Sequence, residues 1–322
     1  MRTYNRILFL FFLAVSGICA VPWYVYAYQV ETLPNTPLER DFVVGPGKIE
    51  VIINPGEKKT VNITVTNRMG DERIFDLNTE DFTGSRDTQK TVVLLGEDRG
   101  PYSLKDYIAT EKKSFVLKHG ERATIPVTIS IPSDAQPGGL YGSVLVSTVS
   151  KPSTIGGTEV NGGAAIVSRI GTLFFIRVPG KVKEDGSVKE FSTANNQVLF
   201  GGGPIPLDIL FENNGSVYLN PYGEISIKNM FGSEVGSAPV DPWFSLPSSL
   251  RLREISWDKN FLFGRYTATV KINRGYDDIV DEKSVSFWVI PWKIVLGVFG
   301  AILVLLLSLR FVASKFEIKK KG

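Results

Sequence analysis

The sequence has very few of the side chains on which catalytic and metal sites commonly depend. Its 322 residues include one cysteine, Cys19, and one histidine, His119. A disulfide or a multi-histidine metal site needs more of these residues than the chain contains. His119 also lies between a lysine and a glycine, a context typical of an exposed turn rather than a catalytic triad. We therefore predict a protein that is not an enzyme and that has no cofactor and no metal site.

The acidic residues leave one enzymatic alternative open. The segment GYDDIVDE, residues 275–282, contains Asp277, Asp278, Asp281 and Glu282. Paired carboxylates can hydrolyse glycosidic bonds, and the same oxygens can bind Ca²⁺. A calcium-assisted cell-wall hydrolase is thus an alternative. However, the spacing is not that of an EF-hand loop, and such a run is also typical of a solvated loop.

Long apolar runs occur only at the two ends of the chain. At the N-terminus, Arg2 and Arg6 precede an apolar stretch over residues 7–21, followed by small residues around Ala27. A basic segment, an apolar segment and a small-residue site in this order predict a signal peptide over residues 1–27. The alternative is an uncleaved anchor helix.

The C-terminal apolar run is long enough to cross a bilayer. Residues 294–312 would form a helix of ~28 Å, close to the thickness of the hydrocarbon core. Trp288 and Trp292 precede it, where amphipathic rings favour the membrane interface, and a lysine-rich tail follows. We predict a transmembrane helix over 291–312 and a basic cytoplasmic tail over 313–322, in a single-pass protein of the cell membrane with its N-terminus outside.

The net charge of the chain does not indicate nucleic-acid binding. The whole sequence has a formal charge of +3, but the part between the two apolar ends carries 28 basic and 32 acidic residues. The positive charge therefore comes from the two end segments. A mildly acidic exported part is not the basic surface that nucleic acids require.

Between the two ends the dominant pattern is alternation of apolar and polar residues in short runs. Such runs, rich in valine, isoleucine, threonine and aromatic residues and separated by glycine-containing turns, are typical of half-buried strands. The predicted fold class is all-β, with two tandem immunoglobulin-like β-sandwiches. The predicted segments are an extended lead over 28–41, a first sandwich over 42–185 with a long loop over 150–171, and a second sandwich over 186–290.

A repeated motif supports the duplication. "GGLYGSVLVS" from Gly138 and "FGRYTATVKI" from Phe263 both place a Gly-x-Tyr at the start of an alternating strand. We interpret these runs as closing strands of two similar sandwiches. Tyr141 and Tyr266 are then structural corner residues whose hydroxyls bond to backbone.

Aromatic residues in a loop of the second unit are the candidates for a binding surface. Trp243 and Phe244 lie in "DPWFSLP" between two prolines, where a large ring is less easily buried than in an alternating strand. We therefore interpret Trp243 and Phe244 as candidate partner contacts, with packing into the core as the alternative.

The order of segments resembles the WxL-interacting proteins of bacterial surfaces. The chain places "INPGEKKTVNITVTN", "GLYGSVLVSTV", "PLDILFENNG" and "FGRYTATVKI" between its apolar N-terminus and its C-terminal span and lysine-rich tail. The resemblance covers nearly the whole chain. It implies that the first sandwich is similar to a peptidoglycan-binding domain and that the second engages WxL surface proteins. No binding residue is carried over, since no family binding motif matches position by position.

These observations predict a membrane-anchored extracytoplasmic binding or scaffold protein. Its two sandwiches would contact cell-wall polymer, another surface protein, or both, its C-terminal helix would contact the membrane, and no nucleic-acid partner is expected. The alternative binding function is that of an envelope chaperone acting by strand addition, which requires an unpaired sheet edge.

Overall fold

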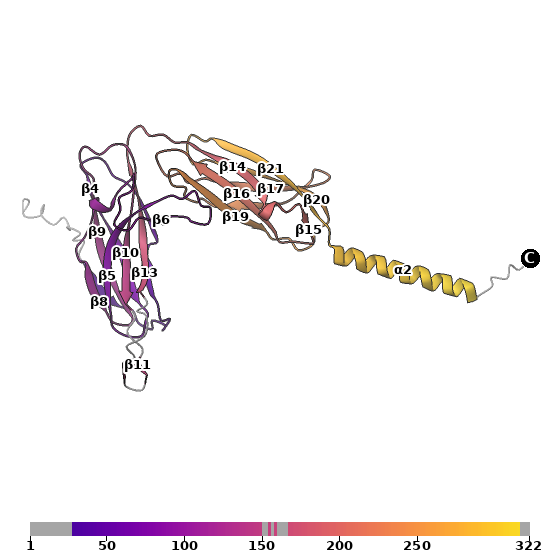
Figure 1. The fold of residues 1–322 in the computed structure, drawn as a ribbon, viewed down its shortest axis with the longest axis horizontal. Helices are drawn as coiled ribbons and strands as arrows, with labels where there is room; N and C mark the ends of the chain where they lie inside the picture. Colours follow the sequence, from indigo (N-terminus) through magenta and orange to yellow (C-terminus); the bar gives the residue numbers. More distant parts are fainter. Residues whose placement is uncertain (1–27, 150–153, 156–157, 160–166, 316–322) are drawn as a thin grey trace, which may run out of the picture.

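Two β-sandwiches meet at a bend, and a single long helix leads away from the second one (Figure 1). The structure, a computed structural model, describes residues 28–149, 154–155, 158–159 and 167–315. The predicted signal peptide and residues 316–322 of the predicted tail lie outside the described residues. So does much of the loop predicted at 150–171. The predicted all-β fold class is confirmed.

The first sandwich consists of two main sheets. One has the order β1-β9-β4-β2, with β7 also pairing with β9, and the other has the order β3-β13-β10-β5-β6, with β8 also pairing with β5. A separate short hairpin, β11-β12, lies between β10 and β13 in sequence. The elements are β1 (Gln29–Thr32), β2 (Phe42–Gly45), β3 (Lys48–Ile52), β4 (Lys58–Asn67), β5 (Arg73–Thr83), β6 (Val93–Leu94), η1 (Lys105–Tyr107), β7 (Ile108–Thr110), β8 (Ser114–Leu117), β9 (Glu121–Ser130), β10 (Gly138–Val149), β11 (Thr154–Ile155), β12 (Thr158–Glu159) and β13 (Val167–Val178).

The second sandwich is smaller and has the same central arrangement. Its sheets have the orders β14-β16-β19 and β15-β21-β20-β17-β18. The elements are β14 (Gly186–Thr193), η2 (Ala194–Asn196), β15 (Leu199–Phe200), β16 (Ile205–Asn213), β17 (Tyr222–Asn229), β18 (Glu234–Val240), β19 (Ser249–Trp257), β20 (Gly264–Asn273) and β21 (Val280–Val289), followed by α2 (Trp292–Lys315).

Alternation of side chains explains why these segments form sandwiches. In β20 every second residue from Tyr266 to Ile272 is buried, and in β9 every second residue from Ala123 to Ile129 is fully buried. A strand points successive side chains to opposite faces, so one face of each sheet is apolar and packs on its partner sheet. Each sandwich therefore has its own core.

The duplication predicted from the Gly-x-Tyr motif is visible in the strand order. β2-β4-β9 of the first sandwich corresponds to β14-β16-β19 of the second, and β13-β10-β5 corresponds to β21-β20-β17. A short strand also runs parallel to the last strand in each copy, β3 beside β13 and β15 beside β21. The Gly-x-Tyr strands are β10 and β20, which are paired on both sides and are each followed by a later strand of the same sheet, β13 or β21, so they are central and not closing strands.

A buried asparagine occupies the same position in both copies. Asn67 ends β4 and Asn213 ends β16, and both are fully buried. Each side-chain oxygen accepts a hydrogen bond from the amide two residues later. Each side-chain amide donates to the carbonyl four residues later and to a distant carbonyl. The partners, at 2.8–2.9 Å, are Met69, Asp71 and Leu117 for Asn67, and Gly215, Val217 and Ser245 for Asn213.

The segment predicted to be an extended lead and the end of the predicted long loop contain more strand than expected. β1, within residues 28–41, pairs with β9 through four residues, Gln29–Thr32. β10 continues to Val149, and β13 already begins at Val167. Between the sandwiches, β13 ends at Val178 and β14 begins at Gly186.

The apolar side chains described in the helix α2 lie outside the cores of both sandwiches. Residues Trp292–Val312 are long and apolar enough to cross a membrane by length and composition, with a mean hydropathy of 2.5 and none of this window buried. Figure 1 shows α2 leading away from the end of the second sandwich that lies opposite the first.

We expect Asn213→Ala to destabilise the second sandwich by roughly 2–3 kcal/mol, because two buried carbonyls and one amide lose their partner. Urea unfolding of the full chain in detergent, followed by tryptophan fluorescence, measures this effect, since Trp243 and Trp257 lie in that core. The exposed Asn260, in the loop before β20, provides the control, and Asn260→Ala should change stability by less than about 0.5 kcal/mol. Equal effects for the two variants would contradict the role assigned to Asn213.

Candidate functional site

The two sandwiches contact each other through a buried aromatic cluster, which we call the joint. The joint consists of Phe82, Tyr141 and Phe175 of the first sandwich and Leu246 of the second, with Tyr218 and Phe244 of the second sandwich packed against them. The Phe175 ring centroid lies 5.0 Å from that of Phe244 and 5.2 Å from that of Tyr218, in edge-to-face geometry. Such contacts are favourable for aromatic pairs.

The sequence of β13 explains how it can face the core and the joint at once. In "TLFFIRV", Phe174 and Ile176 pack in the first core, while Phe175 lies on the other face in the joint. A strand that is apolar on both faces is covered on both faces. The outer face of β13 is covered by the second sandwich.

Tyr141 bonds across the joint rather than within its own sandwich. Its hydroxyl oxygen accepts a hydrogen bond of 2.7 Å from the backbone N–H of Tyr218. Burial raises the pKa of Tyr141 far above its ordinary range, and burial also raises the pKa of Tyr218 to about 12. Both hydroxyls therefore stay neutral and available as hydrogen-bonding groups at physiological pH.

The glycine of the Gly-x-Tyr motif has a different role in each copy. A Cβ on Gly139 would overlap the Tyr141 hydroxyl, so this glycine leaves room for the ring that reaches the joint. Gly264 instead has a φ of 108°, which favours glycine. The Tyr266 hydroxyl lies 3.2 Å from both the N–H and the C=O of Phe263, which is a bond to backbone within its own sandwich.

Polar contacts surround the joint and connect the loop after β5 to the second sandwich. Arg86 pairs with Glu212 of β16 at 2.9 Å, and Lys189 of the second sandwich pairs with the same carboxylate at 2.7 Å. The Leu250 N–H donates to the Ser85 carbonyl at 2.9 Å. The hydrogen bonds from Lys189, Asn214 and Arg86, in that order, lower the pKa of Glu212 to about 2.

The two candidate contact residues of the second unit are not on an open surface. Trp243 is 6% exposed and packs in the second core, with its ring centroid 6.1 Å from that of Phe211. Phe244 is half-buried in the joint, with the Lys48 ammonium 5.4 Å from its ring centroid. Phe244 therefore contacts the first sandwich, and neither ring is free to meet another molecule in this arrangement.

The acidic segment and the histidine also have structural partners. Asp281 pairs with Arg274 at 2.5 Å and accepts a hydrogen bond from the Val188 amide. His119 accepts a hydrogen bond from the Gly70 N–H through Nδ1, and its Nε2 lies 3.2 Å from a backbone carbonyl. Within the described residues, no group of three or more His, Cys, Asp or Glu side chains is placed to hold a metal ion.

An unpaired edge on β13 is the most distinctive feature of the first sandwich. β3 pairs with β13 only over residues 173–177, and in the described part of the chain no strand pairs with this side of residues 167–172, which we call the β13 edge. Leu173 donates its N–H towards β3, to the Gly47 carbonyl. Because backbone groups alternate in direction along a strand, Val167 and Arg169 also point their N–H and C=O outward.

A polar groove adjoins the β13 edge. It has a volume of about 810 Å³ and crosses the outer face of the sheet from β13 over β10 and β5 towards β7. Its walls include Asn78, Glu80, Ser147, Val167 and Arg169. Arg169 forms an ion pair with the nearly buried Glu80. No sequence pattern predicts this pair, because the two residues are 89 positions apart and belong to no motif.

Comparisons with known proteins identify fold neighbours only. No family model matches the chain, and no curated protein matches it. Among solved structures, the class 5 fimbriae chaperone CfaA has 12% identity and a TM-score of 0.36, with 78% of this chain and 100% of that chain covered. The E. coli chaperone DraB has 13% identity and a TM-score of 0.33, with 77% and 96% covered. A PapD-like domain of human CEP192 has 11% identity and a TM-score of 0.30, with 45% and 89% covered.

These TM-scores are below 0.5, so the two-sandwich fold of this chain follows from its own strand order. Membership of the WxL-interacting proteins stays a prediction, since no family model matches.

We expect Tyr141→Phe to weaken the joint, because the Tyr218 N–H loses its acceptor while the ring remains. The cost should be about 1–2 kcal/mol. Spin labels on the two sandwiches should report a broader distribution of inter-domain distances. Tyr266→Phe, which removes a hydroxyl within the second sandwich only, should leave that distribution unchanged. A similar broadening in both variants would contradict the assignment of Tyr141 to the joint.

The ion pairs of Glu212 should make the joint sensitive to acid. Because the pKa of Glu212 falls from an ordinary value of 4.5 to about 2 on folding, its contribution is fully present above pH 4.5. The contribution is lost as the pH falls towards 2. As the pH falls between these values, the melting temperature of the full chain in detergent should fall further in the natural chain than in Glu212→Gln. Parallel pH profiles would contradict this expectation.

Proposed function

We propose that this protein is a membrane-anchored binding protein that captures an extended segment of a protein partner at the β13 edge. The partner segment would add as a strand beside residues 167–172, outside the cytoplasmic membrane. The observation that carries the proposal is the pair of outward-pointing backbone groups on Val167 and Arg169, next to a groove. Strand addition uses such groups for affinity and adjacent pockets for specificity.

The exposed side chains of the edge support the same interpretation. Val167 and Ile170 are 57% and 45% exposed, so an added strand would cover apolar surface as well as form main-chain bonds. An unpaired edge of this kind pairs readily with another chain unless it is protected. The charged pair of Arg169 and Glu80 lies beside it and offers a polar contact to the partner's side chains.

The anchor in this proposal is α2. Its exposed apolar residues would lie in lipid, and the two sandwiches would stand on the outer side of the membrane. The basic tail after the helix favours the cytoplasmic side for the C-terminus. A binding site held at a membrane surface suits a scaffold or an envelope chaperone, and no catalytic group is required for either.

A cell-wall polymer is the second candidate ligand, and the polar walls of the groove favour it. Asn78, Glu80 and Arg169 can hydrogen-bond to sugar hydroxyls or to peptide groups. A polymer would bind in the groove without using the backbone of the β13 edge. Its binding therefore does not need the N–H of Val167, whereas an added protein strand does.

We expect Val167→Pro to abolish capture of the protein partner, because proline removes an outward N–H without touching the bonds to β10. Val167→Thr keeps the N–H and the strand preference and should retain binding. Full-length protein in detergent is tested for retention of surface-protein extracts and of isolated wall. If both variants bind isolated wall equally and neither captures a protein, the polymer would be favoured instead.

Hydrogen exchange on the purified complex tests the geometry directly. The amides of Val167 and Arg169 should become protected when the partner binds, while those of Ser168 and Ile170 are already bonded to β10 and should change little. Uniform protection of all four amides, or of none, would contradict strand addition.

A further inference from the structure

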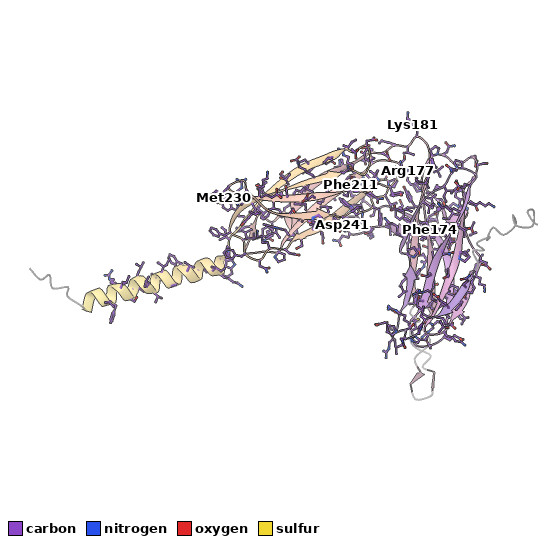
Figure 2. The ribbon with its side chains drawn as sticks, turned by 180° about the vertical axis from the view of Figure 1, so that it is seen from behind. Phe174, Arg177, Lys181, Phe211, Met230 and Asp241 are labelled. Atoms are coloured by element: carbon purple, nitrogen blue, oxygen red, sulfur yellow. The ribbon has the colours of Figure 1, made fainter. Side chains whose placement is uncertain are left out.

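The end of the second sandwich nearest α2 carries an exposed apolar surface, which we call the apolar tip. It consists of Met230, Phe231, Phe261, Phe263 and Trp292. Phe231 is 83% exposed, the largest fraction among the exposed apolar side chains of the described residues. Figure 2 shows Met230 at the end of the sandwich from which α2 begins. Single exposed apolar residues are normal, but five at one end of a domain form a patch.

The tip is built from segments that contact one another. Met230, in the turn between β17 and β18, places its sulfur against Gly264 at the start of β20. Phe261 and Trp292 line one hollow of about 460 Å³, together with Gly201–Gly203 before β16. The turn, the loop before β20 and the start of α2 therefore form one continuous surface.

The apolar side chains of the tip are held outward by buried or bonded neighbours. Leu262 is 3% exposed and anchors the loop, so that Phe261 and Phe263 on either side of it remain exposed. In the turn, the side-chain oxygen of Asn229 accepts hydrogen bonds from the amides of Phe231 and Ser233 at 3.0 and 3.1 Å. The tip is thus a defined surface and not a set of loose side chains.

The connection to α2 leaves little room between the sandwich and the membrane. β21 ends at Val289, and α2 begins at Trp292, with only Ile290 and Pro291 between them. The connection is also bonded, because the Ile290 N–H donates to the Phe200 carbonyl at 2.8 Å. Once α2 spans a bilayer, two bonded residues cannot move the tip far from the lipid headgroups.

We propose that the apolar tip inserts into the interfacial layer of the bilayer that α2 crosses and seats the second sandwich on the membrane surface. The proposal rests on the membrane anchor of the proposed function. Its occupant is lipid, because the tip is continuous with the first turn of a helix that is apolar on all sides. Aromatic side chains before a span favour this interfacial layer.

The basic residues at the tip fit the same partner. The Lys293 ammonium lies 5.8 Å from the ring centroid of the exposed Trp292, and the Lys259 ammonium lies 5.9 Å from the ring centroid of the buried Trp257. Ammonium groups at the membrane surface attract anionic headgroups. A bilayer of phosphatidylcholine and phosphatidylglycerol is therefore the appropriate probe.

The test places a fluorescent NBD label at single cysteines in full-length protein with Cys19→Ser, reconstituted at one chain per nanodisc of that composition. Nitroxide-labelled lipids serve as quenchers. Phe231→Cys reports the tip and Leu303→Cys reports the middle of α2. Tyr222→Cys is the matched control, because Tyr222 begins the strand β17 that leads to the tip. It lies about 25 Å from the tip along that strand.

We expect the label at residue 231 to lose most of its emission with shallow nitroxides, the label at 303 with deep nitroxides, and the label at 222 with neither. Quenching at 303 without quenching at 231 would overturn the seating of the tip and leave the anchor in place. The absence of quenching at 303 would overturn the anchor itself. Quenching at 231 that appears only with two chains per disc would assign the tip to self-association and overturn the proposal.

A variant with Phe231→Ser and Phe261→Ser provides a second readout that does not depend on the label at the tip. Both side chains are exposed, so the sandwich should stay folded. A label at 222 should then gain access to shallow nitroxides, because the sandwich is free to tilt towards the membrane. An unchanged signal at 222 would show that the two aromatic residues do not hold the domain on the bilayer.

Discussion

The buried aromatic joint is the contact on which the shape of the molecule depends. It covers the outer face of β13 and β10 with residues of the second sandwich. The uncharged hydroxyl of Tyr141 accepts a hydrogen bond there from the Tyr218 amide. Removing this cover would expose several rings to water at once. The joint occupies one half of that face, and the groove lies on the other half. The β13 edge is unpaired at residues 167–172 because β3 pairs with β13 only over residues 173–177.

The alternating strands, the number of sandwiches and the apolar end helix could be predicted because each follows from local sequence pattern. The repeated asparagine at the ends of β4 and β16 is also legible in "TVTN" and "LFEN", since the same side chain closes the same turn. The period of a strand determines which side chains share a face. It does not determine what covers that face, and the joint was therefore not predicted.

Tyr141 and Trp243 illustrate this difference. Both were assigned from their sequence neighbours, one to a corner within its sandwich and the other to a free loop. In the structure Tyr141 bonds to the other sandwich, and Trp243 packs in a core. The signal that could have revealed the joint is "LFF" in β13, which is apolar on both faces. The β13 edge had no such signal, since pairing partners are distant in sequence.

The joint and the short connection to α2 limit how far the two sandwiches and the helix can move relative to one another. A flexible linker would let the β13 edge sample a large volume and would lower its effective concentration near a partner. In the proposed anchored arrangement, this restriction would keep the edge within a narrow range of heights and orientations above the membrane, so less freedom would be lost when a partner binds. The proposed arrangement would favour partners that approach from a fixed direction, such as chains attached to the same surface.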